Sequence, residues 1–237
     1  MTAGYGQRQC VEGAKLPWVE SPMMGVTRKR LWHVGAAESG IVTSLVRYQP
    51  GSRFASHAHP QGEEILVLDG VFSDEHGHYP AGTHLLNPDG SSHAPYSDSG
   101  CLLLVKLRQY DGQGRRQQCV DSGELPWEST ATPGLLRKPL YHQPGFSQRI
   151  ELLQLRPGTQ LTDWHHPNGA EIFLLEGEVQ EGVLRHGDGQ ANLEEESTRS
   201  GSERLKTYGP ETWWRLPAGY RHDFSSASGC VLYLCRG

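Results

Sequence analysis

The sequence predicts an all-β protein built from two tandem domains, each a sandwich or jelly-roll barrel. Glycine and proline are abundant, at 29 and 15 of 237 residues, which favours frequent turns over long helices. The apolar runs are short and are mostly bounded by Gly, Pro, Asn or Asp, as in antiparallel strands joined by tight turns. The chain also repeats itself, which indicates two copies of one domain.

The repeat is carried by four pairs of segments that keep their order along the chain. The offset between copies is 109 residues for the first pair, 107 for the second and 129 for the last two. The pairs are LPWVESPMMGVTRKRL with LPWESTATPGLLRKPL, HPQGEEILVLDG with HPNGAEIFLLEG, NPDGSSH with LPAGYRH, and SGCLLL with SGCVLY.

The rise in offset from 107 to 129 places an insertion of 22 residues in the second copy. It falls in the polar, charged segment 183–206, which we expect to be a loop. We therefore predict an N-terminal domain over 1–115 and a C-terminal domain over 116–237 that carries the inserted loop.

Each copy contains three apolar runs that we expect to be its central strands. Short runs of this kind close naturally into a jelly roll. The runs are GIVTSLVRY (40–48), EEILVLDGVF (63–72) and GCLLLVKL (100–107) in the first copy, and RIELLQL (149–155), EIFLLEGEV (171–179) and CVLYLC (230–235) in the second.

Charge and cysteine content narrow the classes of protein to which this chain can belong. The net charge of −5 and a pI near 6.2 offer no broad basic surface for nucleic acid or an anionic membrane. The N-terminus lacks a secretion signal and no run has the ~20 apolar residues of a membrane span, so we expect a cytoplasmic protein. The five cysteines form no CxxC pair, which argues against a disulfide framework; Cys101 and Cys230 lie in apolar runs and are expected in the core.

Three histidines and a glutamate form a candidate metal site. His57 and His59 are two residues apart, so on a strand they face the same side, and Glu63 shares their parity. Glu64 has the opposite parity and is the weaker candidate. His93 follows a Pro-x-Gly turn in a second segment and closes the set. Three imidazoles and one carboxylate suit a borderline divalent ion such as Zn, Fe, Mn, Ni or Cu.

These two segments read G-x5-H-x-H-x3-E-x6-G from Gly51 and G-x5-P-x-G-x2-H from Gly82, and they resemble the two motifs of the cupin superfamily. Ser97 stands where the second motif often ends in asparagine. The segments LPWVESPMMGVTRKRL, SLVRYQPGSRF, HPQGEEILVLDGVFSDEHGHYPAGTHLLNPDGSSHAP and LLLVKLRQYD resemble the cupin domain of the ChrR type, the sensor half of a bacterial anti-sigma factor. The resemblance is strong from Leu16 to about Asp111 and weaker from Leu125 to the end.

The resemblance implies a bicupin with one divalent ion, zinc first and iron, manganese or nickel as alternatives, bound by His57, His59, Glu63 and His93. The second copy keeps only two of the four ligands, so we expect a metal-free barrel there, and Glu211 replaces the glycine that opens its second motif. The large aromatic residues of that copy could fill the vacated cavity or line a pocket. The corresponding positions are Trp164, His166, Ala170 and His222, and the aromatic residues are Trp164, Trp213 and Trp214.

Three functions remain open on the sequence. The first is a sensor or regulatory protein that responds to an oxidant or small ligand and controls a protein partner. The anti-sigma half of the ChrR type is a separate N-terminal zinc domain, and fifteen residues precede Leu16, so direct sigma-factor binding stays open. The second is a metal-dependent enzyme of the dioxygenase kind, in which Arg53 could hold a substrate carboxylate in the ligand pocket. The third is a metal-stabilised fold without turnover.

Overall fold

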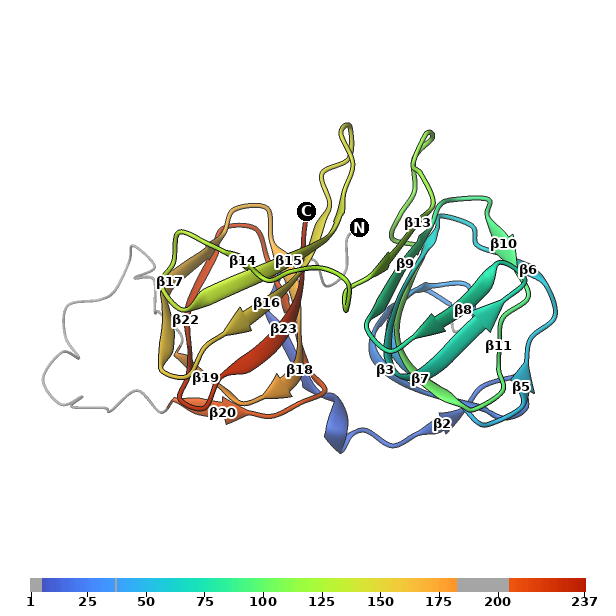
Figure 1. The fold of residues 1–237 in the computed structure, drawn as a ribbon, viewed down its shortest axis with the longest axis horizontal. Helices are drawn as coiled ribbons and strands as arrows, with labels where there is room; N and C mark the ends of the chain where they lie inside the picture. The colour runs from blue at the N-terminus through green and yellow to red at the C-terminus, as the bar shows by residue number, and fades with distance from the viewer. Residues whose placement is uncertain (1–5, 37, 183–204) are drawn as a thin grey trace, which may run out of the picture.

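The computed structural model describes residues 6–36, 38–182 and 205–237, which form two β-barrels side by side (Figure 1). The one helical element in these ranges is the 3-10 turn η1 (Gly13–Lys15). The all-β prediction is therefore confirmed, and the predicted strands all appear.

The N-terminal barrel is built on one large antiparallel sheet with the strand order β13-β9-β7-β12-β4-β3-β2. The short strands β5, β8 and β11 extend this sheet, and β6 and β10 form a separate pair across the mouth. Its strands are β2 (Val19–Glu20), β3 (Val26–Val34), β4 (Ile41–Tyr48), β5 (Ser52–Arg53), β6 (His57–Ala58), β7 (Glu63–Asp74), β8 (Gly77–Pro80), β9 (Thr83–Asn87), β10 (Ser92–His93), β11 (Tyr96–Ser97), β12 (Cys101–Leu107) and β13 (Gln118–Asp121).

The C-terminal barrel pairs a seven-stranded sheet, β1-β21-β18-β23-β16-β15-β14, with a four-stranded sheet, β17-β22-β19-β20. Its strands are β1 (Gln9–Glu12), β14 (Glu128–Ser129), β15 (Leu135–His142), β16 (Arg149–Leu155), β17 (Thr159–His166), β18 (Ala170–Gly177), β19 (Val179–Gly182), β20 (Lys206–Tyr208), β21 (Thr212–Leu216), β22 (Tyr220–Ser226) and β23 (Cys230–Arg236).

The two barrels exchange strands. The N-terminal strand β1 pairs with β21 of the C-terminal barrel, while β13, which precedes the second copy, pairs with β9 of the N-terminal barrel. In Figure 1 the blue N-terminal segment and the green β13 cross between the barrels. The segments are QCVE at 9–12 and QCVD at 118–121, which have the same 109-residue offset as the first pair of repeats. A division at residue 115 therefore does not describe where these two strands pack.

A shared core joins the barrels. One buried cluster takes Leu31, Leu66 and Leu104 from the first barrel and Phe173 and Tyr233 from the second. Each barrel also has its own interior cluster. Because successive residues of a strand face opposite sides, one face of each sheet fills its own barrel and the other packs against the partner barrel.

Buried charges cross this interface. The Glu64 carboxylate accepts hydrogen bonds from His84 (3.0 Å) and Tyr110 in its own barrel and from Tyr233 (2.7 Å) in the other. Lys106 lies 3.8 Å from Glu64 and 3.4 Å from Glu171 of the second barrel. Glu64 thus faces the barrel interface, away from the interior, as its parity predicts.

The glycine that ends the first motif is required by close backbone approach in both barrels. Gly70 has φ +73°, and an added Cβ would lie 2.2 Å from the Gly100 carbonyl oxygen. Its repeat equivalent Gly177 has φ +79° and the same clash at 2.3 Å with the Gly229 oxygen. The second motif opens on Gly82 at φ +91°, whereas Glu211 takes that place in the second copy at φ 63°. Such a conformation costs a residue with a Cβ about 1 kcal/mol.

Other sequence expectations have mixed outcomes. Cys101 and Cys230 are buried, as predicted. Nearly all of the inserted segment 183–206 lies outside the described residues, which resume at 205. Within the described ranges, no helix has the length and apolarity needed to cross a membrane.

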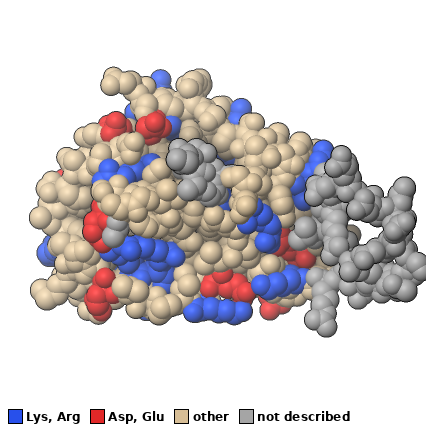
Figure 2. All heavy atoms as spheres, turned by 180° about the vertical axis from the view of Figure 1, so that it is seen from behind, with Lys and Arg blue, Asp and Glu red and all other residues tan. Residues whose placement is uncertain are grey.

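Figure 2 shows Lys, Arg, Asp and Glu side chains interspersed on one face of the molecule.

Candidate metal centre

The local backbone brings the predicted histidines together. Strand β6 pairs antiparallel with β10, so that His57 lies directly opposite His93. The chain then turns at Gln61 and Gly62, both with positive φ, before β7 begins at Glu63. At Gly62 an added Cβ would lie 2.8 Å from the Tyr110 Cβ, so this turn requires glycine.

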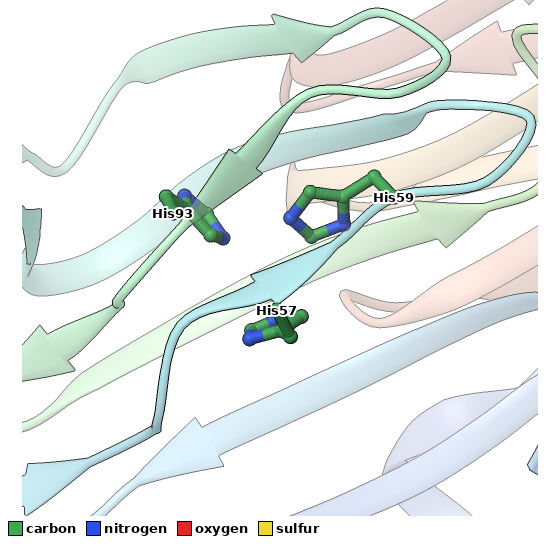
Figure 3. Close-up of side chains that lie close together, drawn as sticks. All are labelled: His57, His59 and His93. Carbon is green, nitrogen blue, oxygen red and sulfur yellow. The ribbon is translucent and has the colours of Figure 1, made fainter.

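His57, His59 and His93 form a compact triad (Figure 3). One ring nitrogen from each lies within 4.8 Å of the other two, and the ring centroids are 4.7–5.4 Å apart. His59 and His93 are buried, whereas His57 is exposed. Donor nitrogens that share an ion at about 2.1 Å lie roughly 3–4 Å apart, so a small inward shift would place all three on one ion.

Hydrogen bonds orient two of the three rings. The Nδ1 atom of His57 lies 3.0 Å from the carbonyl oxygen of Ala55, and the Nδ1 atom of His93 lies 3.1 Å from the Asp74 carboxylate. Since both partners only accept, each Nδ1 carries the proton and donates it, and each Nε2 presents its lone pair. This arrangement is typical of metal-ligating histidines.

Burial keeps the imidazoles of His59 and His93 in the neutral form that binds metals. Burial, with the nearby His93 and His57, lowers the pKa of His59 to about 3. Burial likewise lowers the pKa of His93, although Asp74 acts in the opposite direction. The Nε2 atom of His59 is buried without a hydrogen-bond partner among the described residues. An orphaned buried nitrogen beside two oriented imidazoles fits a metal site.

Glu63 lies at the edge of the triad. Its Oε2 atom is 3.5 Å from Nε2 of His59 and 3.6 Å from Nε2 of His93, and the residue is 6% exposed. The side-chain amide of Asn87 donates to Oε2 (3.0 Å), and Gln117, which directly precedes the exchanged strand β13, donates to the Asn87 oxygen (3.1 Å). Burial raises the pKa of Glu63 to about 8, with Asn87 opposing the shift. All four predicted ligands thus converge.

The triad opens onto a cavity of about 280 Å³ inside the N-terminal barrel. Its walls are mainly apolar and aromatic, with the candidate ligands on one side. A space of this size lies just below the range of about 300–1,000 Å³ that is typical of small-molecule pockets. Residues that shape it include Val26, Val46, Tyr48, Phe54, Ile65, Phe72, Leu103, Val105 and Arg108.

Arg53 lies elsewhere. It is not among the residues that line this cavity. Its guanidinium donates to the Asp98 carboxylate at 2.7 Å and stacks on Tyr96, with both partners of the ion pair exposed. Two other arginines line the cavity: Arg28 of β3, and Arg108, which directly follows β12.

Sequence reasoning also missed Asp74, the carboxylate that orients His93. A signal was present, because Asp74 and Glu181 occupy the same repeat position, 107 residues apart. In the second barrel Glu181 accepts a hydrogen bond from Nδ1 of His222 at 3.2 Å, so the same pairing recurs. The repeat gives no such signal for Asn87, which holds Glu63, or for Tyr48, which lines the cavity. Their equivalents in the second copy are Leu216 and Leu155.

The second barrel has a different interior. The Nε2 atoms of His166 and His222 lie 3.1 Å apart, and Trp164 stacks on His222 with the ring planes 6° apart. Trp214 is fully buried in the barrel core, whereas Trp213 packs between the two barrels. Among the described residues, the triad of the first barrel is the one group of three or more metal-binding side chains.

A known protein family matches this sequence. The ChrR cupin-like domain model matches residues 6–111 and 115–237. No curated protein matches the sequence.

Solved structures share the fold at low sequence identity. A candidate dioxygenase from Nostoc punctiforme superposes with TM-score 0.71 at 16% identity, over 96% of this chain and 81% of that one. YlbA from E. coli gives 0.66 at 14% identity, over 98% and 91% of the two chains. A mutant oxalate decarboxylase from Bacillus subtilis gives 0.64 at 12% identity, over 96% and 76%. The duplicated barrels and the match to both halves show that the chain belongs to the ChrR cupin-like family.

Proposed function

We propose that the chain is a single-metal bicupin that senses an oxidant or a small ligand at the N-terminal barrel. The observation that carries the proposal is the oriented triad of His57, His59 and His93, which opens onto a cavity. A structural ion would be enclosed by protein ligands, whereas a sensing or catalytic ion keeps a position open toward its ligand.

Each residue has a defined part. His57, His59 and His93 would hold the ion through Nε2, and Glu63 would complete the set as a fourth ligand. Asp74 keeps the His93 ring in the ligating tautomer, and Asn87 holds the Glu63 carboxyl. A bound divalent ion would supply a Lewis-acidic centre. Zinc is the first choice for this donor set, with iron, manganese and nickel as alternatives.

The regulatory part of the proposal rests on the family. The sensor halves of ChrR-type anti-sigma factors are cupins, and ligand binding there acts on a protein partner. In this chain the exchanged strand β13 connects the second copy to the metal centre through Gln117 and Asn87. This contact offers a route by which a change at Glu63 could reach the partner barrel.

A metal-dependent dioxygenase is the second candidate, and the cavity beside the triad is the observation that favours it. Metal analysis of protein purified without added metal, joined to an oxygen-uptake screen with diketone, flavonol and thiol compounds, separates the two. A sensor is expected to contain one ion per chain and to consume no oxygen. Sustained turnover would establish the enzyme, and absence of any ion would reject both.

A further inference from the structure

The cavity over the triad contains two polar groups that nothing in the fold uses. Tyr48 is 7% exposed and lines the cavity, yet its hydroxyl has no hydrogen-bond partner among the described residues. Arg108 lines both this cavity and the pocket between the barrels, and its guanidinium forms no ion pair or hydrogen bond with the part of the chain that is described. The hydroxyl is not wholly enclosed by protein and the guanidinium is half-buried, so each is accessible to a ligand that enters the cavity.

The backbone at Arg108 is held in an unfavourable conformation. Its φ is 61°, and its amide donates to the Gly62 oxygen at 2.9 Å, beside the first ligand-bearing turn. Such strain in a residue with a Cβ persists where the surroundings impose it and concentrates at ligand-binding sites. In the repeat, the equivalent position is Gly237.

The second barrel serves as an internal comparison. Leu155 replaces Tyr48 in the copy that has lost two metal ligands, and it is buried in the apolar core of that barrel. Tyr48 and Arg108 are therefore both absent from the second barrel, where the buried hydroxyl without a hydrogen-bond partner is that of Tyr220, beside His222.

The remaining cavity wall is apolar and aromatic. Phe54 and Phe72 lie between Tyr48 and the histidines: their ring centroids are 5.3 and 5.9 Å from Tyr48, and 5.7 and 5.9 Å from His57 and His93 respectively. These rings suit the flat face of an aromatic ligand. Tyr48 pairs with Cys101 at one end of β12, and Arg108 follows the other end.

The charge of the cavity favours an anion. Arg28 also lines it but is paired with Glu38 through both terminal nitrogens of its guanidinium. Once a divalent ion is bound, the ion and the two arginines outweigh the charges of Glu38 and Glu63. Arg108 is the cation without a partner, and a guanidinium binds a carboxylate through two parallel hydrogen bonds.

We propose that this cavity binds a small aromatic carboxylate with a second polar oxygen, with Arg108 holding the carboxylate and Tyr48 hydrogen-bonded to the other oxygen. The inference rests on the proposed function, because it names the ligand class of the same metal site. The single-ring size follows from the volume of about 280 Å³.

Calorimetric titration of zinc-loaded protein with benzoate, 4-hydroxybenzoate and neutral benzyl alcohol tests the proposal. Wild-type protein is expected to bind 4-hydroxybenzoate most tightly and benzyl alcohol least. Arg108→Gln should weaken both carboxylates by about 10- to 100-fold, as for loss of a charged hydrogen bond, and leave benzyl alcohol unchanged. Tyr48→Phe, which keeps the ring, should remove the advantage of 4-hydroxybenzoate over benzoate.

Arg53→Gln is the matched control, since it removes an arginine that lies outside the cavity, and it should bind all three compounds as wild type does. The proposal is overturned if no carboxylate binds to wild type, or if Arg108→Gln or Tyr48→Phe binds both carboxylates like wild type. Elemental analysis of every preparation separates failure of the proposed ligand class from failure of the proposed function. An ion bound at the triad with unaltered carboxylate binding in the variants rejects only the ligand class, whereas failure of wild type to retain zinc rejects the proposed function.

Discussion

At the scale of single residues, the orphaned nitrogen of His59 is the feature that most directly implies a bound ion. It is buried between two rings whose free nitrogens face the same point, and no described side chain satisfies it. A buried polar atom left without a partner costs about 1–3 kcal/mol. An ion shared with His57 and His93 would remove that cost.

We expect His59→Ala to abolish metal binding and to lower the melting temperature of protein purified with its ion, because bound metal stabilises the native state. Elemental analysis and thermal unfolding measure the two effects. His166→Ala is the control at the repeat-equivalent position and should leave the metal content unchanged. Equal metal content in wild type and His59→Ala would reject the assignment.

Asp74→Asn tests the carboxylate that sequence reasoning missed. The amide side chain can still occupy the site but no longer accepts a charged hydrogen bond from Nδ1 of His93. Loss of such an outer partner typically reduces metal affinity 10- to 100-fold. Competition titration with a chelator measures the affinity, and wild-type affinity in Asp74→Asn would show that His93 needs no orienting partner.

At the scale of elements, the exchanged strands decide which barrel each terminal segment supports. Gln117, beside β13, reaches the candidate ligand Glu63 of the first barrel through Asn87. Arg8, at the repeat-equivalent position beside β1, instead forms an ion pair with Glu181 inside the second barrel. Equivalent residues in the two copies thus act on opposite barrels.

Paired substitutions at these positions test the exchange. Gln117→Ala should weaken metal binding by up to about tenfold, because the contact is one residue removed from Glu63. Arg8→Ala should leave metal affinity unchanged and lower the free energy of unfolding by about 2 kcal/mol, because Glu181 stays buried without its cation. Chelator competition and urea unfolding give the two readouts. The reverse pattern would mean that each strand supports its own copy.

These elements also show where prediction from sequence ends. His57, His59, Glu63 and His93 could be predicted because strand parity and two local motifs place them. Asn87 and Asp74 could not be assigned roles, since their contacts depend on which strands pair and in which register. The repeat of QCVE and QCVD identifies equivalent strands, but two equivalent strands fit either barrel edge equally well on the sequence. The exchange is therefore a property of the tertiary fold.

At the scale of the whole molecule, the barrels are joined by a shared apolar core and by the buried carboxylate of Glu64. Burial raises the pKa of Glu64, but Lys106 and hydrogen bonds from His84 and Tyr110 more than offset this and lower it to about 2. Because the folded-state value lies below the usual 4.5, the ionised carboxylate contributes stability above about pH 4.5, and this contribution is lost as the pH falls toward 2.

We expect the free energy of unfolding of Glu64→Gln to be about 3 kcal/mol lower than that of wild type at pH 7. This is the order of magnitude that the lowered pKa of Glu64 implies. The gap should shrink as the pH falls from about 4.5 to about 2, because wild type alone loses the charge. Urea unfolding of both proteins at several pH values measures it. A gap independent of pH would show that the Glu64 charge does not contribute to holding the barrels together.

The central claim is that duplication of the fold was not accompanied by duplication of the site. Trp164 and Ala170 replace an imidazole and a carboxylate in the second barrel, which leaves His166 and His222 facing each other beneath the Trp164 ring. An anomalous-scattering map of crystals of the metal-loaded protein, collected at the absorption edge of the bound metal, tests this most directly. We predict one peak per chain, among His57, His59 and His93 of the N-terminal barrel. Equal peaks in both barrels would contradict the account.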